Sequence, residues 1–214
     1  MLEKSGSEVR KRKGRKNRRS LNTEEHILLI ATELFSRNGF TTTTTRQLCA
    51  ATGLSASSIY YHYGNKMGLY LSALKWASEG RVQQFEEILE QSVDPIKNLR
   101  SLVDAFVSFC AEEPVLVKLI KREQLEENPD TVDALTNSPL ARMAAIMLEI
   151  ICKLPTKEDP SMVVASLMGL VVHRYEARMS WSHLEGFGVG VLDPKAVGEH
   201  VFNVLLKGIL GDDG

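Results

Sequence analysis

The chain has 214 residues, 43% of them hydrophobic and 25% charged, enough for one large domain or for a small domain followed by a medium one. This composition is that of an ordinary globular protein and excludes collagen-like, disulfide-rich and low-complexity classes. No apolar stretch approaches the about 20 residues that a membrane span needs, and the N-terminus lacks the apolar core of a signal peptide. We therefore expect a cytoplasmic protein that makes no contact with the membrane.

The net charge of −1 hides a strong asymmetry along the chain. Residues 1–20 hold nine Lys or Arg against two Glu, a charge of +7, which leaves −8 for the remainder. Residues 10–19 read RKRKGRKNRR, a run that cannot form a core and is expected to be a disordered arm until it meets a polyanion such as DNA. The plainer alternative is a solvated tail without a partner.

Local patterns give no sign of catalysis. The three cysteines, Cys49, Cys110 and Cys152, are far apart and each is set in an apolar helical pattern, as expected of reduced thiols in a core. Neither a nucleophile elbow nor a phosphate loop, a metal-ligand spacing or a converging carboxylate pair is recognisable. We predict that the chain is not an enzyme and has no cofactor and no metal.

Helix signals recur throughout, whereas alternating strand patterns bounded by hairpin turns are absent, so the fold class is predicted to be all-α. The first helix is expected over residues 23–38. Asn22 can cap it together with Glu25, and Gly39 supplies a left-handed stop.

Two short helices follow, over residues 45–52 and 56–63. Thr44 and Gln47 form a capping box for the first of them, Gly53 breaks the chain, and Ser55 caps the second, which stops at Gly64. Two short helices around a glycine turn predict a helix-turn-helix.

A fourth helix is expected from residue 65 to beyond residue 89, as a connector between two domains. Downstream, Asp94-Pro95, Ser138-Pro139, Asp159-Pro160 and Asp193-Pro194 each place a capping side chain before a first-turn proline. About nine helices are expected in total. The predicted organisation is a basic arm over residues 1–20, a helix-turn-helix domain over 21–70, and a helical effector-binding and dimerisation domain over 71–214.

The helix over residues 56–63 has the properties of a recognition helix. Ile59 and Tyr63 can anchor it, which leaves Ser57, Ser58 and Tyr61 near the solvent face, where small side chains allow close approach to bases. The same helix and its flanks supply Tyr60, His62 and Lys66, suited to phosphate oxygens.

The start of the preceding helix adds two candidates. Arg46 can form a bidentate hydrogen bond with guanine, and Thr45 with its neighbouring N–H groups can bind a phosphate. The plainer alternative is that Arg46 and Lys66 are solvated charges, His62 an exposed polar residue and the tyrosines core packing.

The sequence resembles the tetracycline-repressor (TetR) family of bacterial regulators, most densely over residues 27–74, where the matching stretch is IATELFSRNGFTTTTTRQLCAATGLSASSIYYHYGNKMGLYLSAL. The resemblance implies three N-terminal DNA-binding helices and a divergent helical C-terminal domain whose last two helices form a dimeric four-helix bundle. It also implies phosphate contacts from Thr45, Tyr60, His62 and Lys66, and base-proximal contacts from Arg46, Ser57, Ser58 and Tyr61. Met67 and Gly68 stand where the family usually has an acidic residue, so the fourth helix is expected to start softly.

The C-terminal part offers a candidate ligand cavity of mostly apolar wall with a few polar groups. The alternative is that Met and Phe at helical spacing are plain core, and that residues 173–178 form a solvated or subunit-facing surface. A small hydrophobic or aromatic effector is the expected occupant. The candidate ligand-binding residues are Phe106, Phe109, Cys110, Met143, Met147, His173 and Tyr175.

The last helix carries an apolar stripe that can support a homodimer by pairing with the helix that begins at Pro160. The same stripe can instead close the core of the monomer. It consists of Val197, Val201, Val204, Leu205 and Ile209, with Gly198 and Gly208 permitting close approach.

Taken together, these patterns predict a ligand-responsive homodimeric repressor that binds a palindromic operator in double-stranded DNA. An activator of the same fold and a nucleoid-organising protein of low sequence preference remain as alternatives.

Overall fold

The computed structural model describes residues 23–210 apart from 79, 127, 182 and 187–188. The predicted basic arm therefore lies outside the described residues. Within them the chain is all-α, as predicted, with twelve α-helices and one 3-10 turn rather than about nine helices. None of the helices in this part of the chain is both long and apolar enough to cross a membrane.

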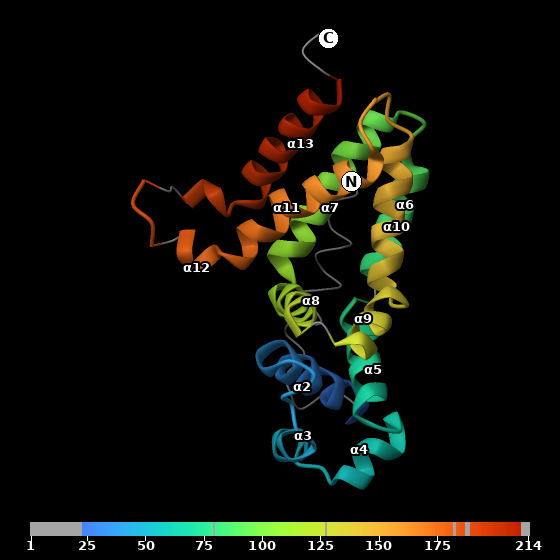
Figure 1. The fold of residues 1–214 in the computed structure, drawn as a ribbon, viewed down its shortest axis with the longest axis vertical. Helices are drawn as coiled ribbons and strands as arrows, with labels where there is room; N and C mark the ends of the chain where they lie inside the picture. Colours follow the sequence, from blue (N-terminus) through green and yellow to red (C-terminus); the bar gives the residue numbers. More distant parts are fainter. Residues whose placement is uncertain (1–22, 79, 127, 182, 187–188, 211–214) are drawn as a thin grey trace, which may run out of the picture.

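The N-terminal head consists of α2 (Thr23–Asn38), α3 (Thr45–Thr52) and α4 (Ala56–Tyr63), at one end of the elongated molecule (Figure 1). All three helices have the predicted bounds. The Thr44–Gln47 capping box is formed in both directions, and Gly53 closes α3 at a φ of 73°, where a side chain would be strained. Local capping chemistry is therefore sufficient to place these helices.

Helix α5 (Lys66–Ser78) completes the core of the head. Tyr70 is fully buried, and its ring lies edge-on at 5.3 Å from the ring of Phe35. Ile27, Leu48 and Ile59 are also fully buried, one from each helix of the head. Each such side chain contributes about 1.5–3 kcal/mol by leaving water, so α4 is held firmly against the other helices.

Gly68, one reason for the predicted soft start of the fourth helix, has a structural role, and the softness itself stays a prediction. A Cβ at Gly68 would overlap the backbone carbonyl oxygen of Tyr63, so glycine is required where α4 and α5 meet. The side chain of Asn65 accepts a hydrogen bond of 2.8 Å from the Gly68 N–H and thereby caps the helix.

The prediction of one continuous fourth helix was wrong. The chain instead forms α5 and α6 (Arg81–Gln91), separated at Gly80, which has a φ of 81°. The break was missed because one interior glycine is a weak signal, and the contacts that fix the bend come from residues more than 30 positions away.

The remaining helices form the C-terminal domain, with α7 packed against α6, α10, α11 and α13 (Figure 1). Their starts at Pro95, Pro139, Pro160 and Pro194 confirm the predicted capping pairs. The domain comprises α7 (Pro95–Glu112), α8 (Pro114–Glu126), α9 (Pro129–Thr136), α10 (Pro139–Cys152), α11 (Pro160–Glu176), α12 (Arg178–Trp181), the 3-10 turn η1 (Val189–Val191) and α13 (Pro194–Leu210).

The apolar stripe of α13 serves the core of the monomer. Val197, Val201, Leu205 and Ile209 are buried where α13 packs on α7 and α11, and only Val204 is exposed, at 43%. Gly198 belongs to the same contact, since a Cβ there would lie 2.7 Å from the Asp104 carboxylate. Of the two alternatives, the structure therefore has the stripe closing the core of the monomer.

Candidate nucleic-acid interface

The outer face of α4 is small, polar and open. Ser57, Ser58, Tyr61 and His62 line a shallow surface hollow, and the Tyr61 side chain is 86% exposed. The Ser55 hydroxyl lies 2.9 Å from the hydroxyls of both Ser57 and Ser58 and accepts a bond from the Ser58 N–H. The first turn of α4 therefore presents ordered hydroxyl groups to solvent, on a helix fixed from behind by Ile59.

Thr45 and Tyr60 are brought together at the start of α3. Their hydroxyl oxygens lie 2.7 Å apart, and both side chains are half-buried. Thr45 is the first residue of α3, where the helix has free N–H groups and a positive dipole end. The pair and these N–H groups form one surface able to bind a phosphate.

Arg46 is exposed on the first turn of α3 and forms no hydrogen bond or ion pair within the described residues. Its neighbour Gln47 is committed to the capping box with Thr44. Arg46 is thus the cation of the head that is available for an added partner, next to the exposed face of α4.

His62 lies at the end of α4 and has an acidic neighbour. Its Nδ1 is 3.6 Å from a carboxylate oxygen of Glu24, and both side chains are exposed. The same carboxylate, after the larger effect of burial, raises the pKa of Tyr63. A phosphate would have to compete with Glu24 for His62. Sequence reasoning missed Glu24, since nothing local links residues 38 positions apart.

The structure gives Lys66 a role within the head. Its Nζ donates to the carbonyl oxygens of Phe40, Thr43 and Thr41 at 2.8, 3.0 and 3.4 Å, and lies 4.4 Å from the centre of the Phe40 ring. Lys66 therefore holds the turn between α2 and α3 in shape. Its predicted contact with phosphate stays a prediction.

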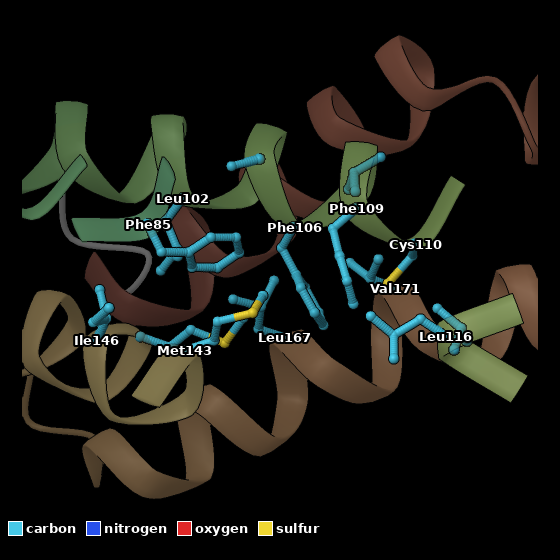
Figure 2. Packing of buried hydrophobic residues seen from close by; sticks show 14 of the residues in the cluster. Phe85, Leu102, Phe106, Phe109, Cys110, Leu116, Met143, Ile146, Leu167 and Val171 are labelled. Atoms are coloured by element: carbon cyan, nitrogen blue, oxygen red, sulfur yellow. The ribbon is translucent and has the colours of Figure 1, made fainter. Parts of the chain in front are cut away.

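Most of the predicted ligand-binding residues gather in the core of the C-terminal domain. Phe106 and Phe109 of α7 are buried with their rings stacked at 6.2 Å, close to Cys110 and facing Met143 of α10 (Figure 2). Met147 is buried in the same cluster. These apolar side chains are packed as core, and nothing in their packing identifies an occupant.

Tyr175 and His173 differ in position although both lie on α11. Tyr175 packs against the core, and its hydroxyl is buried without a hydrogen-bond partner among the described residues. His173 is exposed on the other side of α11, with its ring edge-on to Trp181 at 5.8 Å. The structure thus brings Tyr175 to the cluster and leaves His173 outside it.

Among the comparisons with known proteins, the match to a family model covers the N-terminal head. Residues 27–73 match the model of bacterial regulatory proteins of the tetR family. Curated relatives named nucleoid occlusion factor SlmA match at low identity. The protein of Photobacterium profundum is 22% identical over 161 residues, which cover 72% of this chain and 82% of that protein. The protein of Escherichia coli is 24% identical over 141 residues, which cover 66% of this chain and 69% of that protein.

Solved structures share the fold over nearly the whole chain. The regulator FadR of Bacillus subtilis, in complex with stearoyl-CoA, has a TM-score of 0.68 and 17% identity and covers 86% of this chain and 98% of its own. The TetR-family regulator PfmR of Thermus thermophilus has a TM-score of 0.63 and 18% identity, and the match covers 91% of this chain and 99% of PfmR. These neighbours are transcriptional regulators, and none of them indicates an enzyme family.

Proposed function

Since residues 27–73 match the model of the tetR family of bacterial regulatory proteins, we propose that the chain is a member of that family and a sequence-specific regulator of transcription that inserts α4 into the major groove of DNA. The observation that carries the proposal is the first turn of α4. It exposes Ser57 and Ser58 on a helix that is rigidly backed by Ile59. Small hydroxyl side chains let a helix approach base edges and can donate to or accept from them.

The residues around α4 divide into two roles. Ser57, Ser58, Tyr61 and Arg46 face outward and are proposed to contact bases, with Arg46 suited to the paired acceptors of guanine. Phosphate contacts are proposed for the Thr45–Tyr60 pair and for His62 and Lys66, the last two needing to exchange a partner within the chain for the phosphate.

A homodimer is proposed through the outward faces of α11 and α13, which pack on one another within the monomer. These faces carry exposed apolar or small residues, including Met162 at 65% and Val204 at 43% exposure, together with Gly169 and Gly208. Pairing two copies here forms a four-helix bundle, buries the apolar atoms and places two heads on two half-sites about one helical turn apart.

An effector that acts on the C-terminal domain is the next part of the proposal. The fold neighbour FadR holds stearoyl-CoA, and the corresponding domain here has a large apolar core with the Tyr175 hydroxyl at its edge, which has no hydrogen-bond partner among the described residues. We therefore propose a hydrophobic effector with a hydrogen-bonding group, whose binding releases the repressor from its operator. An activator would show the opposite sign in a transcription assay with the operator upstream.

The curated relatives favour a second candidate function. Nucleoid occlusion factors match over about two thirds of the chain or more, and the basic run at residues 10–19 suits unspecific DNA contact. In this function the chain would coat or organise DNA, with the C-terminal domain acting only in assembly.

The test is selection of bound DNA from a random duplex library with the full-length chain, followed by sequencing. An enriched inverted repeat supports the dimeric sequence reader. Salt-sensitive binding without enrichment, abolished by deletion of residues 1–19 and unaffected by substitutions in α4, supports the second candidate instead.

A further inference from the structure

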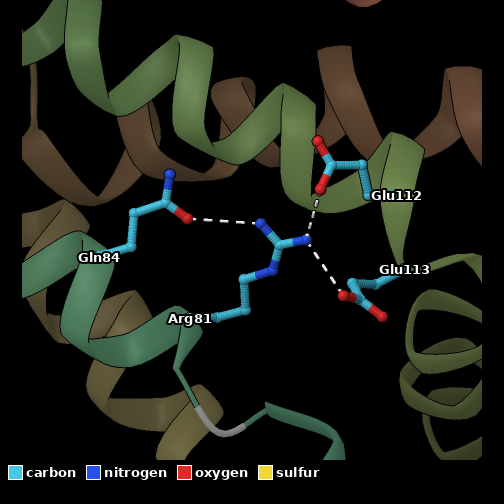
Figure 3. A network of polar contacts seen from close by, with 4 residues as sticks. All are labelled: Arg81, Gln84, Glu112 and Glu113. Carbon is cyan, nitrogen blue, oxygen red and sulfur yellow. Dashed lines mark hydrogen bonds and ion pairs between the residues drawn. The ribbon is translucent and has the colours of Figure 1, made fainter. Parts of the chain in front are cut away.

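An ion cluster around the buried side chain of Arg81 joins two corners of the fold (Figure 3). The guanidinium of Arg81 is 3% exposed, and its Nη2 donates to Glu112 at 3.0 Å and to Glu113 at 3.1 Å, while Nη1 reaches Gln84 at 3.4 Å. Arg81 follows the bend between α5 and α6, and the two glutamates form the bend between α7 and α8. One side chain therefore ties the α5–α6 corner to the α7–α8 corner.

The charges of this cluster are unfavourable within their own helices. Arg81 is the first residue of α6, at the positive end of the helix dipole, and no side chain caps this helix. Glu112 is the last residue of α7, at the negative end of its dipole. Each charge is destabilising where it stands and is offset only when the two corners meet. The cluster thus stabilises one particular placement of the corners.

Stability alone does not require such a cluster. At a buried position, apolar side chains of similar volume often stabilise a protein as much as an ion pair does. Charged groups differ in that they stabilise only when they meet in a defined geometry. The Nε of Arg81 is buried without a hydrogen-bond partner in the part of the chain that the structure describes. The guanidinium is therefore held in place by its partners without being fully satisfied.

Two of the helices that pack on the head meet this cluster. The α5 helix, which ends beside Arg81, packs on α2 and α4. The α8 helix, which begins after Glu113, also packs on α2, where Arg122 donates to the Arg37 carbonyl oxygen at 3.2 Å. A shift between the two corners would move α5 and α8 relative to one another and tilt the head.

The cluster also touches the core in which an effector is proposed to act. The Cζ of Arg81 lies 5.9 Å from the centre of the Phe109 ring, and Phe109 is one helical turn before Glu113. Because Glu112 ends α7 and Glu113 directly follows it, a shift of α7 caused by altered packing around Phe109 would displace both glutamates.

We propose that Arg81 is a positioning residue that keeps the α5 and α8 connections in register and thereby sets the separation of the two α4 helices in the dimer. This inference rests on the proposed function as a dimeric DNA reader. Sequence reasoning missed it, although a Gly-Arg step inside a helical pattern and a Glu-Glu-Pro corner are local signs of two bends.

The test measures discrimination between half-site spacings. Each added base pair moves one half-site by about 3.4 Å and turns it by about 35°, so only a dimer with fixed heads strongly prefers one spacing. Duplexes carrying the selected half-sites at the best spacing, and at one base pair more or less, are titrated with wild type, with Glu112→Gln, and with the charge-neutral triple variant Arg81→Met, Glu112→Gln, Glu113→Gln. Arg142→Met, which breaks the exposed ion pair of Arg142 with Glu86, is the matched control.

Both cluster variants are expected to lose about fivefold or more of the preference for the best spacing, with an unchanged preference for bases within a single half-site. Arg142→Met should behave as wild type. Glu112 is 54% exposed, so Glu112→Gln folds even if the triple variant does not. A folded cluster variant with wild-type spacing preference overturns the role of Arg81. Failure of wild type to select any inverted repeat is a separate result, and it overturns the proposed function first.

Discussion

The hydroxyl of Tyr60 on α4 lies 2.7 Å from the hydroxyl of Thr45 at the start of α3. This bond links the proposed recognition helix to the helix end proposed to receive a phosphate. Half-buried positions let both hydroxyls reach solvent while their apolar parts pack within the head.

Replacing Tyr60 with Phe removes this bond and keeps the ring. We expect a loss of about 1 kcal/mol in the free energy of unfolding, measured in urea. DNA affinity should fall alike for all sequences, since phosphates carry no sequence information. Tyr61→Phe, at the 86% exposed neighbour, is the control and should change stability by less than about 0.5 kcal/mol. Equal unfolding curves for wild type and Tyr60→Phe would show that the bond contributes nothing.

Substituting Lys66 by Met distinguishes a clamp on the turn from a phosphate contact. If Lys66 mainly holds the carbonyl oxygens at residues 40–43, the variant should lose about 1.5–3 kcal/mol of stability. The slope of log affinity against log salt should then stay unchanged. A slope smaller by about 1, with stability retained, would instead assign Lys66 to a phosphate.

Arg46→Ala should relax base preference at one position of the half-site, at a cost of about 1–3 kcal/mol for the preferred base. Because Arg46 is exposed and without a partner in the described part of the chain, stability should change by less than about 0.5 kcal/mol. Arg37→Ala, at another exposed arginine of the head, serves as the control. Identical selected profiles for wild type and Arg46→Ala would remove Arg46 from the base-reading set.

Val204→Glu tests the proposed dimer face without disturbing the core, since this side chain is 43% exposed and its neighbours on α13 carry the internal contacts. Sedimentation should show at least about tenfold weaker dimerisation, because burying an unpaired carboxylate is unfavourable. Val93→Glu, at a fully exposed valine between α6 and α7, should remain dimeric. A fully dimeric Val204→Glu protein would place the interface elsewhere.

Two acidic groups at the edge of the C-terminal core make stability sensitive to high pH. Burial, and then the Glu176 carboxylate, raises the pKa of Cys110 from 9.0 to about 12, and burial raises that of Tyr175 from 10.0 to about 12. The unfolded chain ionises first, so the stabilisation is complete below pH 9 and is lost as pH rises toward 12.

Tyr175→Phe should therefore lose less stability than wild type as the pH rises from 10.0 toward about 12, as urea midpoints would show. At neutral pH this substitution should cost little, since the hydroxyl has no partner among the described residues. The same pH dependence in wild type and in Tyr175→Phe and Cys110→Ala variants would rule out both groups as its source.

The head could be predicted from the sequence because its boundaries are set by local chemistry. Thr44 with Gln47, Ser55, and the glycines at 53 and 64 fix α3 and α4 without reference to the rest of the chain. The side chains expected on the outer face of α4 are exposed in the structure, since a short amphipathic helix has only one apolar side to bury.

Features that depend on contacts between distant residues could not be predicted in this way. The bend at Gly80 is fixed by glutamates more than 30 residues away, and the side of α11 that reaches the core decides between Tyr175 and His173. The stripe of α13 has the same helical spacing whether it meets α7 or a second copy. Spacing identifies an apolar face but not its partner.

The central claim, that α4 reads sequence, is tested most directly by the ratio of affinities for the selected inverted repeat and for a scrambled duplex at one salt concentration. For wild type we expect a ratio of about 1,000 or more. For the Ser57→Ala, Ser58→Ala, Tyr61→Ala triple variant the ratio should fall at least about tenfold, with Arg46 keeping part of the preference and with unchanged affinity for the scrambled DNA. A wild-type ratio near one, or a triple variant that keeps the full ratio, would contradict the claim.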